Sequence, residues 1–148
     1  MSEPLLYLSL YFKTHRDLYY DLLQRVRIDG DWEAWLRFFF EGVVSTAEQA
    51  MTTAHRALAL LRDDRAHIDG LGRVAVSARR VHDLMSRRPL LTIRRAAAEL
   101  GLAQPTIATA LHHLQGLNIV TEMTGRRRHR VFAYDRYVAI LNEGTTPP

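Results

Sequence analysis

Between Asp31 and Asp69 the chain contains one glycine, Gly42, and no proline. Asp31 can cap the first turn of a helix, and the acidic Glu33 favours the positive end of the helix dipole. About 35 helical residues would form a rod of ~50 Å, whose apolar side must be covered by other helices of this chain or of a neighbour. Steps of three and four residues place these apolar residues on that side: Trp32, Leu36, Phe39, Val43, Ala47, Ala50, Ala54, Leu58 and Leu61.

The residues before Asp31 also follow a helical pattern. Pro4 suits the first turn of a helix, and the segment 14–17 resembles a capping box with Asp17 in the place of the usual Glu. Asp29-Gly30 ends the segment. Four aromatic residues in the next helix form a cluster wider than one stripe, which is more typical of a core or a subunit interface than of a ligand site: Trp35, Phe38, Phe39 and Phe40.

A change of charge accompanies the glycines at 70 and 72. Residues 1–70 hold seven Arg and one Lys against eleven acidic residues, a net charge of −3, whereas residues 71–148 hold twelve Arg against five acidic residues, a net charge of +7. We therefore predict a helical domain over 1–70 and a second domain over 71–148. A basic half built on arginine favours phosphate recognition, although the charge alone points slightly more to a solvated basic surface.

From Gly72 onward the pattern becomes more specific. It predicts a first helix that ends before Pro89, a second helix capped by Thr92, a tight turn at Gly101, and a third helix over 104–115 with Pro105 in its first turn. Two strands, 119–123 and 130–134, and a last helix from Asp135 follow. The predicted fold class is mainly α: an N-terminal helical bundle segment with a long helix, then a helix-turn-helix domain with a small two-stranded β wing.

This order of elements resembles a winged helix-turn-helix module of transcription regulators, over roughly 72–143. The resemblance implies that the third helix enters the major groove of DNA and that the wing contacts the backbone. The arginines of the loop would supply affinity that does not depend on sequence. Winged helices also serve as protein-docking and dimerisation modules, and that alternative stays open. The candidate DNA-binding residues are Gln104, Pro105, Thr106, Thr109, His113, Arg126, Arg127, Arg128 and Arg130.

The first half resembles the C-terminal helices of Fic-domain proteins, of the kind that carry a winged helix at the C-terminus. The segments that carry the resemblance are Pro4–Phe12, His15-Arg16, Tyr19-Tyr20, Gly30–Leu36, Phe38–Val43 and Thr46-Ala47. With the second half included, the resemblance extends over essentially the whole chain. Complete Fic domains transfer a nucleotide monophosphate, usually AMP from ATP, to a protein hydroxyl.

The catalytic motif of that family, H-P-F-x-x-G-N-G-R, is absent from the sequence. None of the seven histidines is followed by Pro-Phe, and Gly72-Arg73 lacks the preceding Gly-Asn. The resemblance therefore implies no catalytic residue here, and we expect no enzymatic activity from this chain alone. The alternative function is that of a non-catalytic fragment or subunit of a Fic-type protein adenylyltransferase, whose winged helix docks a partner protein and whose partner carries the catalytic segment.

The composition disfavours several other classes of protein. The chain has no cysteine, and its histidines do not have the spacing of a zinc site, so we expect no metal and no cofactor. Its apolar runs are too short to span a bilayer, so we expect a cytoplasmic protein without a membrane partner. The long, aromatic-rich helix favours a homodimer through the N-terminal helices, which would place two recognition helices over two half-sites.

Overall fold

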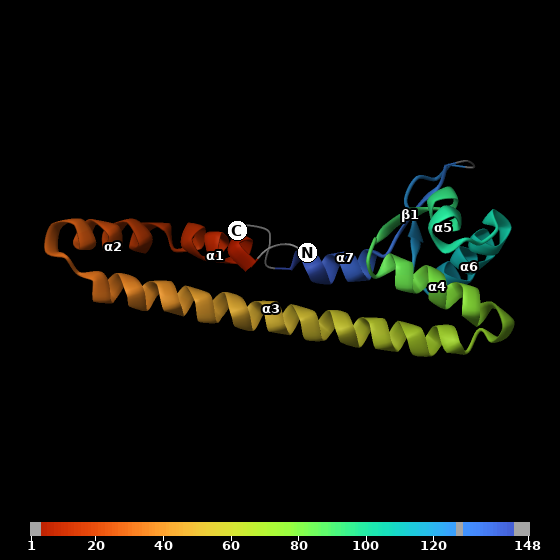
Figure 1. Cartoon of the computed structure of the whole chain (residues 1–148), viewed down its shortest axis with the longest axis horizontal. Coiled ribbons are helices and arrows are strands. Elements are labelled where there is room, and N and C mark those ends of the chain that lie inside the picture. The colour runs from red at the N-terminus through yellow and green to blue at the C-terminus, as the bar shows by residue number, and fades with distance from the viewer. Residues whose placement is uncertain (1–3, 127–128, 144–148) are drawn as a thin grey trace. The chain divides into compact units, whose positions relative to one another are not determined.

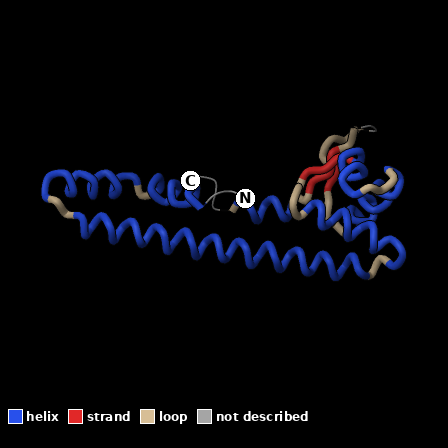
Figure 2. Tube along the Cα trace, in the orientation of Figure 1, coloured by secondary structure: helices blue, strands red, loops and turns tan. Residues whose placement is uncertain are grey.

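The computed structural model describes residues 4–126 and 129–143, and these are mainly helical (Figures 1 and 2). The chain groups into two compact units: one holds the residues up to His55 together with the segment from Asn142, and the other spans Arg56–Leu141. In chain order the elements are α1 (Pro4–Thr14), α2 (Arg16–Asp29), α3 (Trp32–Asp69), a 3₁₀ turn (Gly72–Val74), α4 (Ala75–Met85), β1 (Leu90–Thr92), α5 (Ile93–Leu100), α6 (Gln104–Gly116), β2 (Thr121–Glu122), β3 (Val131–Ala133) and α7 (Asp135–Asn142).

The first unit is held together by aromatic rings between α1 and the beginning of α3. Phe38 is the most buried of them, and its ring lies 5.7 Å from that of Phe12 and 5.4 Å from that of Tyr11. Gly42 allows this approach, because a Cβ at Gly42 would lie 2.7 Å from the Tyr11 ring. Three of the four clustered aromatics thus belong to this core, whereas the fourth, Phe40, is 59% exposed.

The long helix begins as the sequence predicts, but the helix before it does not. The Asp31 carboxylate accepts a hydrogen bond from the Ala34 amide at 3.2 Å, and Gly30 has a left-handed backbone with φ 68°. The capping box predicted at 14–17 is wrong. The Thr14 hydroxyl donates back to the Leu10 carbonyl at 2.9 Å, and His15 at the N-cap makes no side-chain capping bond. A threonine inside the last turn of α1 finds this carbonyl one turn earlier, which competes with capping.

Much of the apolar side of α3 is uncovered within the first unit. The structure confirms a helix over Trp32–Asp69, but its apolar stripe is largely exposed among the residues before Arg56. Leu36 is 46% exposed and Trp32 is 60% exposed. A helix with such a face normally buries it against a partner.

The second unit contains the main hydrophobic core, formed by α4, α5, α6 and the last turns of α3. Four side chains with no exposed surface lie at its centre: Ile68, Val81, Ile107 and Leu111. Ile68 comes from α3, so this core recruits residues that precede the predicted boundary at 70/71. The division into domains at that position stays a prediction.

The sheet of the second unit has three antiparallel strands in the order β1-β3-β2, not the two that the sequence predicts. Leu91 of β1 pairs with Phe132, and Thr121 of β2 pairs with Ala133. The extra strand, Leu90–Thr92, is too short to show a strand period in the sequence, and its partner lies about 40 residues further along the chain. The two expected strands are also shorter than predicted.

The turns between the helices follow the predicted signals. The Thr92 hydroxyl accepts a hydrogen bond from the Arg95 amide at 3.3 Å, which caps α5. Gly101 ends α5 with φ 63°, a left-handed conformation that a side chain would strain. After two more residues α6 begins, so the short connection fixes the angle between α5 and α6.

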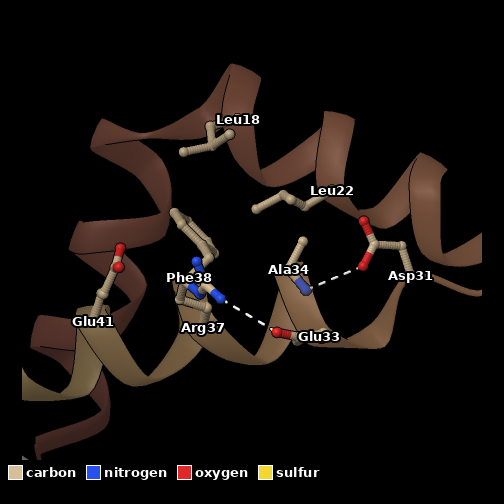
Figure 3. Close-up of a pocket in the computed structure, with 8 residues that line it drawn as sticks. All are labelled: Leu18, Leu22, Asp31, Glu33, Ala34, Arg37, Phe38 and Glu41. Atoms are coloured by element: carbon tan, nitrogen blue, oxygen red, sulfur yellow. Dashed lines mark hydrogen bonds and ion pairs between the residues drawn. The ribbon is translucent and has the colours of Figure 1, made fainter.

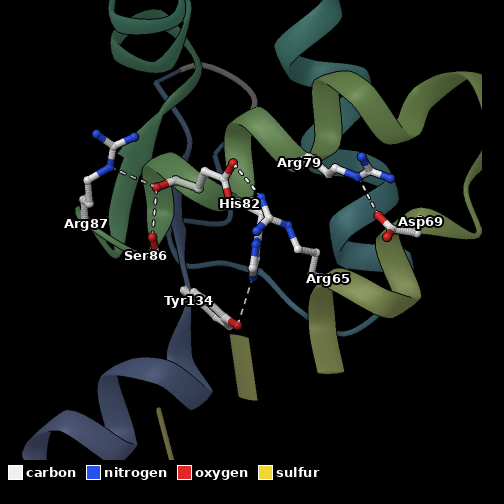
Figure 4. A network of polar contacts seen from close by, with 8 residues as sticks. Arg65, Asp69, Arg79, His82, Ser86, Arg87 and Tyr134 are labelled. Atoms are coloured by element: carbon white, nitrogen blue, oxygen red, sulfur yellow. Dashed lines mark hydrogen bonds and ion pairs between the residues drawn. The ribbon is translucent and has the colours of Figure 1, made fainter. Parts of the chain in front are cut away.

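A buried polar network joins the end of α3 to α4 and to the end of β3. The Tyr134 hydroxyl donates to the Asp64 carboxylate at 2.5 Å. Its oxygen accepts from His82 Nε2 at 3.2 Å, and Figure 4 shows this second contact. Arg136 pairs with the other Asp64 oxygen at 2.5 Å. Because the Tyr134 proton goes to Asp64, His82 carries its proton on Nε2, and Nδ1 is left buried without a partner among the described residues. Burial and then the bond to Asp64 raise the Tyr134 pKa.

Ion pairs at the surface surround this network. Arg65 of α3 pairs with Asp83 of α4 at 3.1 Å, and Arg79 of α4 pairs with Asp69 at the end of α3 at 2.5 Å (Figure 4). All four side chains are about half exposed, so each pair contributes roughly 0–1 kcal/mol. Removing one partner of the buried network should therefore cost more than breaking either ion pair.

We expect Tyr134→Phe to lower the free energy of unfolding by about 1–3 kcal/mol, because it leaves Asp64 and His82 buried with fewer partners. Denaturant titration measures this change. Tyr137→Phe is the matched control, since the Tyr137 hydroxyl has no hydrogen bond in the described structure. Equal effects of the two changes would contradict a special role for the Tyr134 hydroxyl.

Stability should fall between pH 7 and pH 5 because of His82. Burial lowers the His82 pKa, and the nearby Asp64 and Asp83 carboxylates oppose this only in part. The unfolded chain therefore binds a proton below about pH 6.5 that the folded chain does not, and folding stability is lost as the pH falls. His82→Gln, which keeps a donor toward Tyr134, should show a smaller drop in melting temperature over this interval. Parallel curves for the two proteins would contradict the assignment.

Candidate nucleic-acid interface

The third helix of the second unit, α6, has one buried side and one exposed side. Ile107, Leu111 and Leu114 face the core with no exposed surface. Pro105, Thr106 and Thr109 lie on the opposite side and are exposed, whereas Gln104 is exposed because it is the first residue of the helix. The hydrophobic residues thus fix which side of α6 faces solvent, and Thr106 and Thr109 lie on it.

The first turn of α6 presents backbone donors as well as side chains. The N-cap residue, Ala103, has no side-chain acceptor, and Pro105 lies in the first turn. The first hydrogen bond of the helix runs from the Ile107 amide to the Ala103 carbonyl at 3.2 Å. The amides before Ile107 have no acceptor within the helix, and the positive end of the helix dipole lies there. An acceptor such as phosphate oxygen suits this turn.

Two histidines follow on the same helix. His113 is half-buried and lies four residues after Thr109, while His112 is exposed. Their ring centroids are 6.1 Å apart with an interplanar angle of 65°. Thr106, Thr109 and His113 are spaced by three and four residues, so they form one ridge along the exposed side.

The connection between β2 and β3 begins with a turn that is held by the Glu122 carboxylate. We call this turn the Glu122 hook. Glu122 accepts hydrogen bonds from the Thr124 amide at 2.8 Å, from the Thr124 hydroxyl, and from the Gly125 amide at 3.1 Å. Gly125 has φ 59°, a left-handed conformation that glycine adopts freely. These hydrogen bonds, those of Thr124 first, lower the Glu122 pKa, and the positive charge of Arg130 adds to the effect. Sequence patterns contain no signal for this hook.

The arginines of this connection differ in their surroundings. Arg126 is exposed, and the Arg130 guanidinium lies over the Phe132 ring at 5.2 Å from its centroid. Stacking on an aromatic face holds a guanidinium without using its hydrogen-bond donors. Arg127 and Arg128 lie outside the described residues.

Many of the other arginines of the second unit have structural roles. Arg88 and Arg95 both pair with Glu99, at 3.0 and 2.9 Å, and Arg80 donates to the Leu100 carbonyl at the end of α5. Arg94, in contrast, is exposed at the start of α5 and has no ion pair in the described structure. The sequence pointed to phosphate binding from the arginine content of this half taken together. In the structure several of these arginines are held in ion pairs or hydrogen bonds, whereas Arg94 and Arg126 are exposed and have no ion pair among the described residues.

A separate hollow of about 370 Å³ lies between α2 and α3 in the first unit. Leu18 and Leu22 of α2 and Phe38 of α3 point toward one another in it (Figure 3). Its carboxylates have structural partners in two cases: Asp31 caps α3, and Glu33 pairs with Arg37 at 3.3 Å. These two carboxylates of the hollow therefore serve the start of α3, and we assign no catalytic group to it.

Among the described residues no group of three or more His, Asp or Glu side chains could hold a metal ion, and no helix is both long and apolar enough to cross a membrane. No model of a known protein family matches the chain. The resemblance to Fic-domain proteins therefore stays a prediction from the sequence.

The hook at Glu122 predicts a measurable titration. Because hydrogen bonds favour the charged carboxylate, the turn is held at neutral pH and is released only as the pH falls through the lowered pKa. The amide chemical shifts of Thr124 and Gly125 should therefore change with a midpoint below about 4.3, the ordinary value for Glu. Glu122→Gln should abolish this transition. A midpoint at or above the ordinary value would contradict the hook.

Proposed function

We propose that residues 72–143 form a winged helix-turn-helix domain that binds DNA, as part of a transcription-regulator-like protein. The observation that carries the proposal is the exposed side of α6, where Thr106 and Thr109 lie in solvent while the opposite side is buried, together with Gln104, which is exposed at the start of the helix. The order α4, β1, α5, α6, β2, β3 supports it, because this is the order of helices and strands in winged helices.

In this proposal α6 is the recognition helix. Gln104 can pair with adenine through two hydrogen bonds, and the threonines can offer a hydroxyl to phosphate or a methyl group to thymine. The free amides of the first turn favour a phosphate oxygen. The helix has no Arg or Lys between Gln104 and Gln115, so the sequence readout from it is modest.

The connection between β2 and β3 is the wing. Arg126, Arg127, Arg128 and Arg130 supply charge that attracts any DNA sequence, and Glu122 fixes the turn from which the run of arginines begins. Arg94 at the start of α5 is a further candidate phosphate contact, which the sequence did not single out. Arginine side chains and helix N-termini both supply phosphate contacts in protein–DNA complexes.

The relation to Fic-domain proteins is part of the proposal. The helices of residues 1–70 correspond, in this view, to the tail of a Fic domain, and the chain itself has no transferase motif. A docking role for the second unit, toward a protein that carries the catalytic segment, is the alternative. The experiment below separates the two.

Fluorescence anisotropy with a random-sequence duplex tests the proposal at ~50 and ~200 mM salt. A binder that neutralises several phosphates should lose affinity by at least about tenfold between these conditions. The triple variant Arg126→Ala, Arg127→Ala, Arg128→Ala should bind more weakly on every sequence. Gln104→Ala or Thr109→Ala should instead change the preference among sequences.

A control triple variant removes the same charge elsewhere. Arg16, Arg27 and Arg62 are exposed and lie on α2 and α3, so their replacement by Ala should leave DNA affinity within about twofold. Equal losses in the two triple variants would mean that net charge alone drives binding. No binding at ~50 mM salt would overturn the DNA proposal and favour the docking alternative.

A further inference from the structure

The exposed side of α3 in the first unit has the spacing of a coiled coil. Six residues follow one another at intervals of four, three, four, three and four, which is the heptad pattern of the a and d positions. All six are exposed. We call this set the heptad face: Leu36, Phe40, Val43, Ala47, Ala50 and Ala54. Larger apolar residues, Val44 and Met51, lie beside it and are 57% and 61% exposed.

The other helices of the first unit cover a different side of α3. Phe38 contacts Tyr11 and Phe12 of α1, and Gly42 is in close contact with Tyr11 and Leu8. Positions 38 and 42 belong to neither a nor d in this heptad. The heptad face is therefore left open after α1 and α2 have packed.

The sizes of the side chains along this face point to a second copy in the opposite direction. The large residues occur in the first half of the face, and only alanines occur in the second half. When two copies are antiparallel and related by a two-fold axis near Ser45, Leu36 meets Ala54, Phe40 meets Ala50, and Val43 meets Ala47. Each layer then joins one large and one small side chain, and each pairs an a with a d position, as antiparallel coiled coils require.

Parallel packing would fill the face unevenly. Phe40 would meet Phe40 of the second copy, and Ala47, Ala50 and Ala54 would meet only alanines. The distance between the axes would then have to be large at one end and small at the other, which leaves voids. The antiparallel arrangement keeps one distance throughout.

We propose that the heptad face binds the heptad face of a second copy, with the two α3 helices antiparallel. Five large side chains that are 39–61% exposed, together with three alanines, offer on the order of 600 Å² per copy, or about 1,200 Å² in total, the lower limit of specific interfaces. This inference goes beyond DNA binding and does not rest on it, because the heptad face lies entirely within the first unit.

Cross-linking through introduced cysteines tests the register directly, because the natural chain has no cysteine. Leu36→Cys and Ala54→Cys are prepared separately in the full chain. In the antiparallel register the two sulfurs introduced at position 36 of a dimer are held roughly 27 Å apart, and those at position 54 likewise, so neither variant should form a disulfide with itself. An equimolar mixture should form the mixed disulfide. Self-linking of each variant alone, or no link in the mixture, would overturn the proposal.

Sedimentation equilibrium of the unmodified chain gives the independent measurement. We expect a monomer–dimer equilibrium with the dimer dominant at ~100 µM, and Ala50→Glu should weaken it at least about tenfold by burying an unpaired charge. Gln49→Glu is the matched control, since it adds the same charge one residue away from the face and should change dimerisation by no more than about twofold. A monomer throughout, or equal effects of the two variants, would refute the second copy as the occupant.

Discussion

The arrangement of the second unit depends on one buried carboxylate, Asp64. It accepts hydrogen bonds from Tyr134 and from Arg136, and Tyr134 in turn accepts from His82. A carboxylate with so little exposed surface is costly unless its charge is matched and its oxygens are bonded. Both conditions are met only when the end of α3 and the start of α7 meet in one geometry, and His82 near the end of α4 adds its hydrogen bond to Tyr134. The network therefore favours one arrangement over others that would bury the same apolar area.

The elements with local signals could be predicted from the sequence. The absence of proline and the cap at Asp31 indicated the long helix, and Thr92 and Gly101 indicated the ends of α5, because these residues act within one turn of where they stand. The polar residues of α6 are exposed because Ile107, Leu111 and Leu114 fix the buried side. That orientation follows from the 3.6-residue period alone.

The features that could not be predicted depend on residues far apart in the chain. β1 exists because Leu91 pairs with Phe132, and Asp64 is buried because Tyr134 reaches it from 70 residues away. Local patterns contain neither partner. The hook at Glu122 is local but has no established sequence signature. The capping box predicted at Thr14 does not form, because the Thr14 hydroxyl donates to a carbonyl of the preceding turn.

The participation of α3 in the second core has a consequence for how the chain can be divided. The sequence changes character at Gly70, yet Asp64 and Ile68 lie before it and belong to the core behind it. A fragment that starts at Gly72 would expose the side chains around Ile68 and leave Tyr134 and Arg136 without their acceptor. The smallest autonomous folding segment therefore reaches back into α3, and a recombination event at the glycines would separate residues that stabilise each other.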